Sequence, residues 1–255
     1  MPDDFQPVLY SVDGHVARIT LNRPDKRNAL NDSLIAGLKK ALLEANKDEH
    51  VRVAILSGAG KDFCSGADLS ALQKIAVASV QENQDDAKSL MELFLLIREV
   101  SVPVVAAVRG RALAGGCGLA TACDLVLASS GARFGYPEVN IGFVPAMVLA
   151  ILRRNVSEKR SFELITRGEE IDATNAMQIG LVNKVFEEDS FDADVVAYVR
   201  KFGQSSKSAV ALTKKLLYQI DGLDFRDVLE IGVDVNVIAR MTDDCKRGIA
   251  RFLKK

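Results

Sequence analysis

Apolar runs alternate with segments of helical spacing over the first three quarters of the chain. Residues 7–23 contain two alternating runs around Asp13-Gly14, a pattern typical of a tight hairpin. Residues 51–58 form a nearly continuous apolar run, which predicts a strand in a sheet covered on both faces. Between them, residues 28–48 place apolar side chains on one face of a predicted helix: Leu34, Leu38, Ala41, Leu42 and Ala45.

The alternation continues to about residue 190, after which the pattern is helical throughout. Residues 61–72 predict a loop that runs into a helix, and helical spacing continues to about Val100. Residues 102–130 are apolar, then glycine-rich, then small, then apolar again, which predicts strand, loop, helix and strand. Glycines and prolines interrupt residues 132–146, so these residues cannot form one regular element. Later elements are predicted as a helix from Ser157 to Gly168, a short helix and strand over 171–186, and helical segments at 205–220, 224–241 and 242–255.

This order predicts an α/β core over residues 1–195, followed by a helical region over residues 196–255. The chain has 255 residues, of which 48% are hydrophobic and 26% charged, and can bury a sizeable core. Its formal net charge of -1 gives no reason to expect a nucleic-acid or anionic-membrane partner. The basic pairs Lys39-Lys40 and Lys214-Lys215 are predicted to lie on solvated helix faces.

No apolar run reaches the roughly 18 residues that a membrane-spanning helix needs. The first residues, MPDDFQPV, are acidic and lack the basic and apolar regions of a signal peptide. The four cysteines (Cys64, Cys117, Cys123 and Cys245) form no CxxC pair and no metal-ligand spacing. We therefore expect small buried thiols in a reducing compartment, a cytoplasmic protein and no metal site.

The chain has only two histidines, and both have structural explanations. His15 follows the predicted hairpin turn, and His50 lies in a polar link ahead of a strand. A Ser-His-Asp triad, a Cys-His pair or a histidine-ligated zinc would need one of these poorly placed residues. If the protein is an enzyme, its chemistry is expected to depend on carboxylates and backbone amides.

Two segments place small residues ahead of a predicted helix, at residues 64–68 (CSGAD) and 114–118 (AGGCG). Unpaired N–H groups at a helix start suit an anion, and two converging amides form an oxyanion hole. Each segment alone is more often ordinary turn chemistry than a binding site. Neither is a GxxxxGK[ST] phosphate loop or a GxGxxG site, which argues against an NAD-dependent oxidoreductase. Gly118 stands out, because glycine inside a helix costs about 1 kcal/mol relative to alanine.

Five motifs occur in an order that resembles the crotonase family, the enoyl-CoA hydratase/isomerase superfamily. They are ITLNRPDKRNAL, FCSGADLSAL, PVVAAVRGRALAGGCGLATACDLVLAS, FGYPEVNIGFVP and GLVNKVF, and the resemblance covers essentially the whole chain. It implies a spiral of ββα units with C-terminal helices that assemble homotrimers, or homohexamers as dimers of trimers. It also implies an acyl-CoA thioester as substrate, with no cofactor beyond the CoA part of that substrate.

The resemblance carries individual residues into functional roles. The amides of Ser65 and Gly115 match the family's oxyanion hole, which holds the thioester oxygen as it becomes enolate-like. The family's adenosine-binding stretches fall on Lys26, Asn28 and Ala29, and on Ala67, Asp68 and Leu69. Lys26 is placed to meet a CoA phosphate, although a lysine in a loop is by itself usually only solvated.

Many hydratases of this family carry two glutamates that flank the added water. The second matches Glu138, whereas the first would fall at position 118, where this chain has glycine. Glu138 is therefore the expected acid/base, with a structural capping role as its alternative. Glu at position 118 is expected to raise hydration of crotonyl-CoA, provided that the pocket has room for it. Asp68 and Asp124 are expected to be structural, as a helix cap and at a strand start.

Hydration of a 2-enoyl-CoA is the favoured reaction, with Glu138 activating the water. The pKa of Glu138 would then have to lie near neutrality, as burial in an apolar pocket allows. Δ3,Δ2-enoyl-CoA isomerisation is the alternative, and decarboxylation and retro-aldol cleavage are further thioester chemistries of the family. A non-catalytic CoA- or RNA-binding protein on the same scaffold is a third possibility, since fold does not fix function.

Overall fold

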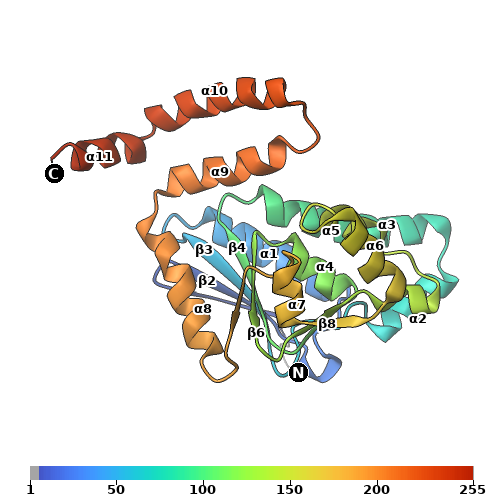
Figure 1. The fold of residues 1–255 in the computed structure, drawn as a ribbon. Coiled ribbons are helices and arrows are strands. Elements are labelled where there is room, and N and C mark those ends of the chain that lie inside the picture. Colours follow the sequence, from blue (N-terminus) through green and yellow to red (C-terminus); the bar gives the residue numbers. More distant parts are fainter. Residues whose placement is uncertain (1–5, 255) are drawn as a thin grey trace.

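The computed structural model describes residues 6–254. Residues 1–5 belong to the segment that we expect not to be a signal peptide, and they lie outside the described residues. Two sheets form the framework, with helices on both faces of the larger one (Figure 1). The larger sheet has the order β1 (Val8–Asp13), β2 (Val16–Leu21), β3 (Val53–Gly58), β4 (Val104–Val108), β6 (Leu125–Ser129) and β9 (Lys184–Phe186). The smaller sheet has the order β5 (Arg111–Leu113), β7 (Arg133–Gly135) and β8 (Glu170–Asp172). The predicted hairpin is confirmed as the antiparallel pair β1–β2, whereas the other neighbours in the larger sheet are parallel.

Helices make up most of the remaining chain. The α-helices are α1 (Asp32–Lys47), α2 (Leu69–Val77), α3 (Val80–Glu99), α4 (Gly115–Ala122), α5 (Ala146–Leu152), α6 (Glu158–Arg167), α7 (Ala173–Gln178), α8 (Phe191–Val199), α9 (Lys207–Gln219), α10 (Phe225–Met241) and α11 (Asp243–Phe252). Short 3-10 helices occur at η1 (Pro24–Lys26), η2 (Pro137–Ile141) and η3 (Arg200–Gln204). The predicted ends of α6 are confirmed, because Ser157 caps its start and Gly168 ends it in a left-handed conformation.

Alternate side chains of the buried strands pack on opposite faces of the larger sheet, as expected for a sheet covered on both sides. Ala54 and Leu56 of β3 belong to the main core with α1, α3 and α4. Val53 and Ile55 face the other side, where α8 contributes Phe191 and its neighbours. All five predicted apolar positions of α1 are buried.

The ββα repeat is visible in the chain order. In β4–β5–α4 and again in β6–β7–α5, the first strand joins the larger sheet and the second joins the smaller one. The expected α/β class, a crotonase-like spiral of ββα units, is therefore confirmed. Three short strands are additional to the prediction: β5 lies inside the glycine-rich turn, β7 lies in the segment interrupted by glycines and prolines, and β8 precedes α7.

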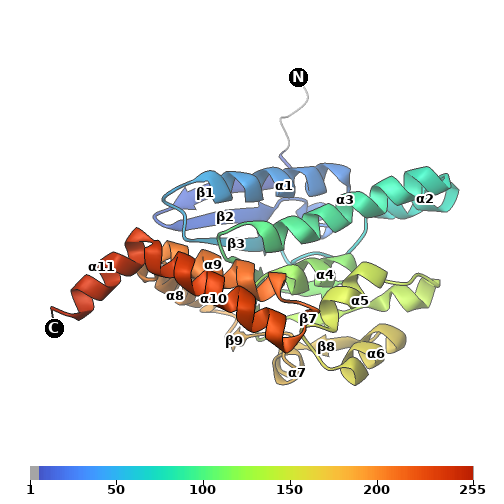
Figure 2. The same cartoon turned by 90° about the horizontal axis from the view of Figure 1, so that it is seen from above.

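The helical end of the chain differs in its packing from the core. The expected boundary after residue 195 falls within α8, where Val195 is buried against the larger sheet. α9 contacts α3, whereas α10 and α11 extend beyond it, away from the sheets (Figures 1 and 2). Neither α10 nor α11 contains a buried residue.

The prediction that Lys214 lies on a solvated helix face is wrong. Its side chain is only 6% exposed, and Nζ lies 2.7 Å from the Asp124 carboxylate. Nζ also donates hydrogen bonds to the carbonyl oxygens of Ile97 and Val102, and the Tyr218 hydroxyl donates to Asp124. A charged group can be buried when it is paired and hydrogen-bonded in this way, so Lys214 fastens α9 to the core.

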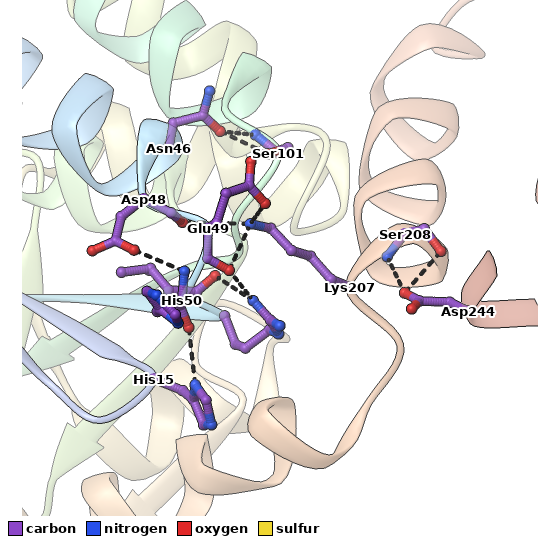
Figure 3. Close-up of polar contacts among 11 residues, drawn as sticks. His15, Asn46, Asp48, Glu49, His50, Ser101, Lys207, Ser208 and Asp244 are labelled. Carbon is purple, nitrogen blue, oxygen red and sulfur yellow. Dashed lines mark hydrogen bonds and ion pairs between the residues drawn. The ribbon is translucent and has the colours of Figure 1, made fainter. Parts of the chain in front are cut away.

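A second polar contact fastens the start of α9 (Figure 3). Lys207 Nζ lies 3.1 Å from the Glu49 carboxylate and donates to the Glu49 carbonyl oxygen. Asp244 of α11 accepts hydrogen bonds from the Ser208 amide and hydroxyl, and these bonds hold the pKa of Asp244 down to about 2. The His15 ring contacts the carbonyl oxygen of His50 in the same corner, in keeping with the structural roles expected for both histidines. Across the described residues, no helix combines the length and apolar character that crossing a membrane requires.

Candidate active site

Three segments that carry the predicted site residues follow the carboxyl ends of three adjacent parallel strands. β3 leads into residues 59–68, β4 into residues 109–116, and β6 into residues 130–138. Carboxyl ends of parallel strands meet at one edge of a sheet, which is where ligands of α/β folds bind. Ser65, Gly115 and Glu138 are therefore delivered to the same end of the sheet.

The first two of these segments touch through their backbones. Leu113 donates its amide to the Cys64 carbonyl oxygen at 2.9 Å. A Cβ on Gly116 would overlap that same carbonyl, so only glycine permits the approach. Gly66, at φ +93°, would place a Cβ 2.7 Å from the Ala114 side chain. These glycines are required by close packing of the two segments, which brings the two predicted amide sites together.

The Gly115 amide is the first of α4 and points away from the helix interior. Within residues 6–254 it has no hydrogen-bond acceptor. The preceding residue, Ala114, adopts φ 51° and ψ -131°, a conformation that costs a residue other than glycine about 1–3 kcal/mol. Its own amide is held by the Gly135 carbonyl oxygen at 2.8 Å. A strained residue directly before a free amide is typical of a functional site.

The Ser65 amide is in a different state. It donates to the Arg27 carbonyl oxygen at 3.1 Å, from the loop that contains η1. Arg27 and Asn28 both have positive φ angles, 49° and 55°, which turn this carbonyl toward Ser65. An oxyanion bound at Ser65 would compete with the Arg27 carbonyl for the amide. The motif at residues 64–68 gave no sign of this contact.

Glu138 lies in η2, and its Oε2 atom is buried with no hydrogen-bond partner in the described part of the chain. Burial raises the pKa of this carboxyl above its usual value, although a hydrogen bond from its own amide opposes the rise. A buried carboxylate oxygen without a donor is costly, and such groups are concentrated at catalytic sites. Burial thus raises the pKa of Glu138, which is the direction of shift that a general acid/base requires.

The site is backed by a closed polar network. The Tyr136 ring is 1% exposed, and its hydroxyl lies 3.0 Å from the Thr121 hydroxyl, which donates to the Cys117 carbonyl oxygen. Burial raises the pKa of the Cys64 and Cys117 thiols to about 12, so neither forms a reactive thiolate. Cysteine as a small buried side chain is confirmed for these two and for Cys123. It is wrong for the partly exposed cysteine of α11, at position 245.

Gly118 has a packing explanation that the sequence did not show. A Cβ at this position would lie 2.5 Å from Val148 Cγ2 and 3.4 Å from the tip of the Phe94 ring. Val148 is a buried β-branched residue of α5 with little rotational freedom. The room that a glutamate at position 118 would need is therefore filled by Val148.

The two stretches predicted to bind adenosine also lie side by side. Leu30 forms a parallel bridge with Ala67, its amide donating to the Gly66 carbonyl oxygen at 2.7 Å. Ala29 lies within the same loop and is buried. Lys26 and Leu69 are exposed, as contact with a ligand would require.

Two members of this set have structural side chains. Asn28 is fully buried, and its amide group donates to the carbonyl oxygens of Ala59 and Asp62, so only its backbone can face a ligand. Asp68 caps α2 through the Ser70 amide, as expected, and Arg23 lies 2.6 Å from its carboxylate. The Arg23 contact and the cap hold the pKa of Asp68 below its usual value.

Arg23 was given no role by the sequence, although it lies in the first motif. Besides Asp68, its guanidinium donates to the Ala29 carbonyl oxygen, so one side chain joins both stretches. Arg111, at the start of β5, lies 3.3 Å from Glu170 at the surface. Arg23 lies two residues after the end of β2, and no pattern in the sequence marked the contacts that it makes.

Comparisons with known proteins agree on one family. A family model described as enoyl-CoA hydratase/isomerase matches residues 11–255. A Thermus thermophilus protein named "Putative enoyl-CoA hydratase" is 39% identical over 242 residues, covering 95% of this chain and 96% of the relative. "Crotonyl-CoA hydratase" of Syntrophomonas wolfei is 32% identical over 253 residues, covering 98% and 96%. A crystal structure of enoyl-CoA hydratase from Mycobacterium smegmatis matches with a TM-score of 0.92 at 32% identity, covering 97% of this chain and 96% of that one.

Proposed function

The chain belongs to the enoyl-CoA hydratase/isomerase family of enzymes, and we propose that it adds water to the double bond of a 2-enoyl-CoA thioester. The observation that carries this proposal is the buried, unpartnered carboxylate oxygen of Glu138 at the same sheet edge as the free amide of Gly115. One group supplies an acid/base, and the other supplies a donor for developing negative charge.

The reaction needs one carboxylate if that carboxylate acts twice. Glu138 takes a proton from water while the oxygen forms a bond to the β carbon of the acyl chain. The electron pair of the double bond moves to the thioester oxygen, giving an enolate. Glu138 then returns its proton to the α carbon, so the product has gained one water and the carboxylate is regenerated. A raised pKa suits both halves of this cycle.

The enolate oxygen is stabilised by the amides of Gly115 and Ser65. One preorganised donor of this kind is worth about 3 kcal/mol in the transition state. The Gly115 amide is free for this role, whereas the Ser65 amide must be taken over from the Arg27 carbonyl oxygen. Arg27 lies between Lys26 and Asn28, two of the residues assigned to CoA. Binding of the CoA part of the substrate at this loop would therefore move the Arg27 carbonyl oxygen and release the Ser65 amide.

The CoA part is assigned to the joined stretches around Leu30 and Ala67. The exposed Lys26 ammonium meets a phosphate, and the backbone of residues 28–29 and 67–69 lines the adenosine. Arg23 holds the two stretches together through its hydrogen bonds to Ala29 and Asp68.

Isomerisation is the second candidate, because only one carboxylate is present where many hydratases have two. In that reaction Glu138 would take a proton from the α carbon of a 3-enoyl-CoA and return it to the γ carbon, with the same enolate between the two steps. The filled space at Gly118 supports this candidate, since it leaves no room for the second carboxylate that many hydratases use.

A substrate panel separates the two. Purified protein is incubated with 2-enoyl-CoA and 3-enoyl-CoA esters of equal length, and products are read by mass spectrometry. Hydration predicts a gain of one water with the 2-enoyl ester. Double-bond migration in the 3-enoyl ester without any water gain would overturn hydration in favour of isomerisation.

A homotrimer, alone or paired as a hexamer, is proposed as the working assembly. Support comes from α10, where apolar side chains at four-residue spacing are exposed: Phe225, Leu229, Val233, Val237 and Met241. A second copy of this chain is the proposed cover for this face. We retain the cytoplasm as its expected location.

A further inference from the structure

The Tyr136 side chain connects the segment that carries Glu138 to the helix that begins at Gly115. Tyr136 directly precedes η2, and its ring is 1% exposed. Its hydroxyl lies 3.0 Å from the hydroxyl of Thr121, in the last turn of α4. A hydrogen bond between two side chains thus joins the two segments whose groups the proposed reaction uses together, the Glu138 carboxylate and the Gly115 amide.

The direction of this hydrogen bond follows from the single proton of each hydroxyl. The Thr121 hydroxyl donates to the Cys117 carbonyl oxygen at 2.7 Å, so the Tyr136 hydroxyl is the donor in the bond between them. Burial raises the pKa of Tyr136 well above its usual value, and the neighbouring Cys117 and Glu138 raise it further. Tyr136 therefore keeps its proton, and this bond, over the whole pH range of an enzyme assay.

The Glu138 carboxylate has no hydrogen bond to another element in the described part of the chain. Its Oε2 atom is buried without a partner, and the hydrogen bond from its own amide moves with it. The Phe143 amide donates to the Glu138 carbonyl oxygen at 3.0 Å, which closes η2 and the turn after it. The place of this carboxylate relative to α4 is therefore determined by the contacts that hold η2 against α4.

Two hydrogen bonds hold this segment near the two ends of α4. The Ala114 amide, directly before the helix, donates to the Gly135 carbonyl oxygen at 2.8 Å. About 10 Å further along α4, Thr121 accepts the bond from Tyr136. Without the Tyr136 hydroxyl, the segment keeps its contact at Ala114 but loses the one that prevents it from turning about that point.

The link from Tyr136 to the acid/base is short and stiff. Pro137 is the one residue between Tyr136 and Glu138, and its ring fixes φ at about −65°. A shift of the Tyr136 ring is therefore passed to Glu138 with few rotatable bonds to absorb it. The same shift hardly reaches the Gly115 amide, because the start of α4 is packed closely at Gly116.

We propose that Tyr136 is a positioning residue for the acid/base: its hydrogen bond to α4 holds η2 in place and fixes the Glu138 carboxylate relative to the Gly115 amide. This role needs no contact between Tyr136 and the substrate. Catalysis depends steeply on such placement, because a misplacement of 1 Å can cost about 10²-fold in rate. The role rests on the proposed function, in which the carboxylate and the amide act on the same thioester.

Removal of the hydroxyl alone tests this role. Tyr136→Phe keeps the ring and should lower kcat for a 2-enoyl-CoA by about 10-fold, as a displacement of less than 1 Å would, while KM changes less than about 2-fold. Thr121→Val removes the acceptor at almost the same shape and should give a similar fall. The double variant should fall no further than either single variant, because all three lack the same hydrogen bond.

The pH dependence of kcat/KM separates positioning from a loss of stability. Its acid limb reports the protonation of Glu138 in the free enzyme, and burial is what raises the pKa of that carboxyl. A displaced η2 exposes the carboxylate to water, so the limb of Tyr136→Phe should move to lower pH, toward the usual glutamate pKa of about 4.3. A variant that is merely less stable keeps the wild-type limb below its melting temperature, which thermal unfolding of each variant gives.

Tyr10→Phe is the matched control for the loss of a tyrosine hydroxyl. The Tyr10 hydroxyl is also buried, without a hydrogen-bond partner among the described residues, and it lies on β1 at the edge of the larger sheet. This variant should leave kcat, KM and the acid limb unchanged.

Three results would overturn the proposal. The first is an acid limb at the wild-type pH in Tyr136→Phe, even if kcat falls, because packing alone would then explain the loss. The second is an additive fall in the double variant, because the two hydroxyls would then act separately. The third is an equal fall in Tyr10→Phe. Wild type that leaves every 2-enoyl-CoA unchanged would instead refute the proposed function.

Discussion

Two helices of this protein, α4 and α10, place their small and apolar residues in opposite environments. Seven of the eight residues of α4 are buried, and its glycines allow contacts with Cys64 and Val148 that a side chain would block. α10 has 17 residues and buries none of them, although an apolar stripe follows its length. The position of α4, and with it the Gly115 amide, is therefore determined by this chain alone. The apolar stripe of α10 is exposed in the single chain, and a second copy of the chain is its proposed cover.

The contact that holds α9, the helix on which α10 packs, to the segment after α4 should give the largest effect on stability. Lys214→Met would leave the Asp124 carboxylate, which directly follows the α4 segment, without its ion-pair partner. Removing one member of a buried pair costs about 3–5 kcal/mol, because the other charge stays buried. Urea unfolding measures the loss. The neighbouring Lys215→Met is the matched control, and its cost should be under about 0.5 kcal/mol. Similar losses in both variants would refute a special role for Lys214.

A substitution at Gly118 tests whether the space around α4 is already filled by neighbouring side chains. Gly118→Glu gains about 1 kcal/mol of helix propensity but must displace Val148 and bury a carboxylate. We expect a net loss of about 1–3 kcal/mol, typical of overpacking, and no gain in crotonyl-CoA hydration.

Combining Gly118→Glu with Val148→Ala shows whether Val148 causes the loss of stability. If Val148 is the obstacle, Gly118→Glu should cost less in the Val148→Ala background than in wild type, as a double-mutant cycle measures. Equal costs in both backgrounds would mean that space beside Val148 does not explain Gly118.

A charge on α10 should alter assembly while hardly changing the fold of one chain. Val233→Asp places a carboxylate in the exposed apolar stripe, so sedimentation should show a shift from trimer or hexamer toward single chains. Asp234→Asn, at an adjacent exposed position, should leave the assembly unchanged. A wild-type protein that sediments as a single chain would refute the proposal that a second copy covers the apolar stripe of α10.

The smallest expected effect is a pH-dependent change in stability at Glu138. Burial raises its pKa, so the folded state holds this proton more tightly than the unfolded chain does. The side chain therefore opposes folding progressively as the pH rises above the unfolded value, about 4.3. Glu138→Gln should melt at a higher temperature than wild type near neutral pH, and this gap should close toward about pH 4. The exposed Glu187→Gln should show no such gap.

The sequence predicted α4, the sheet and the two amide segments, because local periodicity and glycine spacing determine them. It did not predict the reason for Gly118, since Val148 lies thirty positions away on another helix. It also assigned Lys214 to solvent, because a lysine pair on a helix usually faces water and the partner Asp124 is distant in sequence. The hydrogen bond between Ser65 and Arg27 depends on positive φ angles at Arg27 and Asn28. The sequence did not indicate these angles, because neither residue is a glycine.

The central claim is that one carboxylate, Glu138, performs the acid/base chemistry. The most direct measurement is the turnover of a 2-enoyl-CoA by Glu138→Gln, which keeps the shape of the side chain but cannot accept the proton. The account predicts a fall of at least ~10²-fold, the scale of general acid/base catalysis, with the variant folded and still binding the thioester. Turnover equal to that of wild type would contradict it.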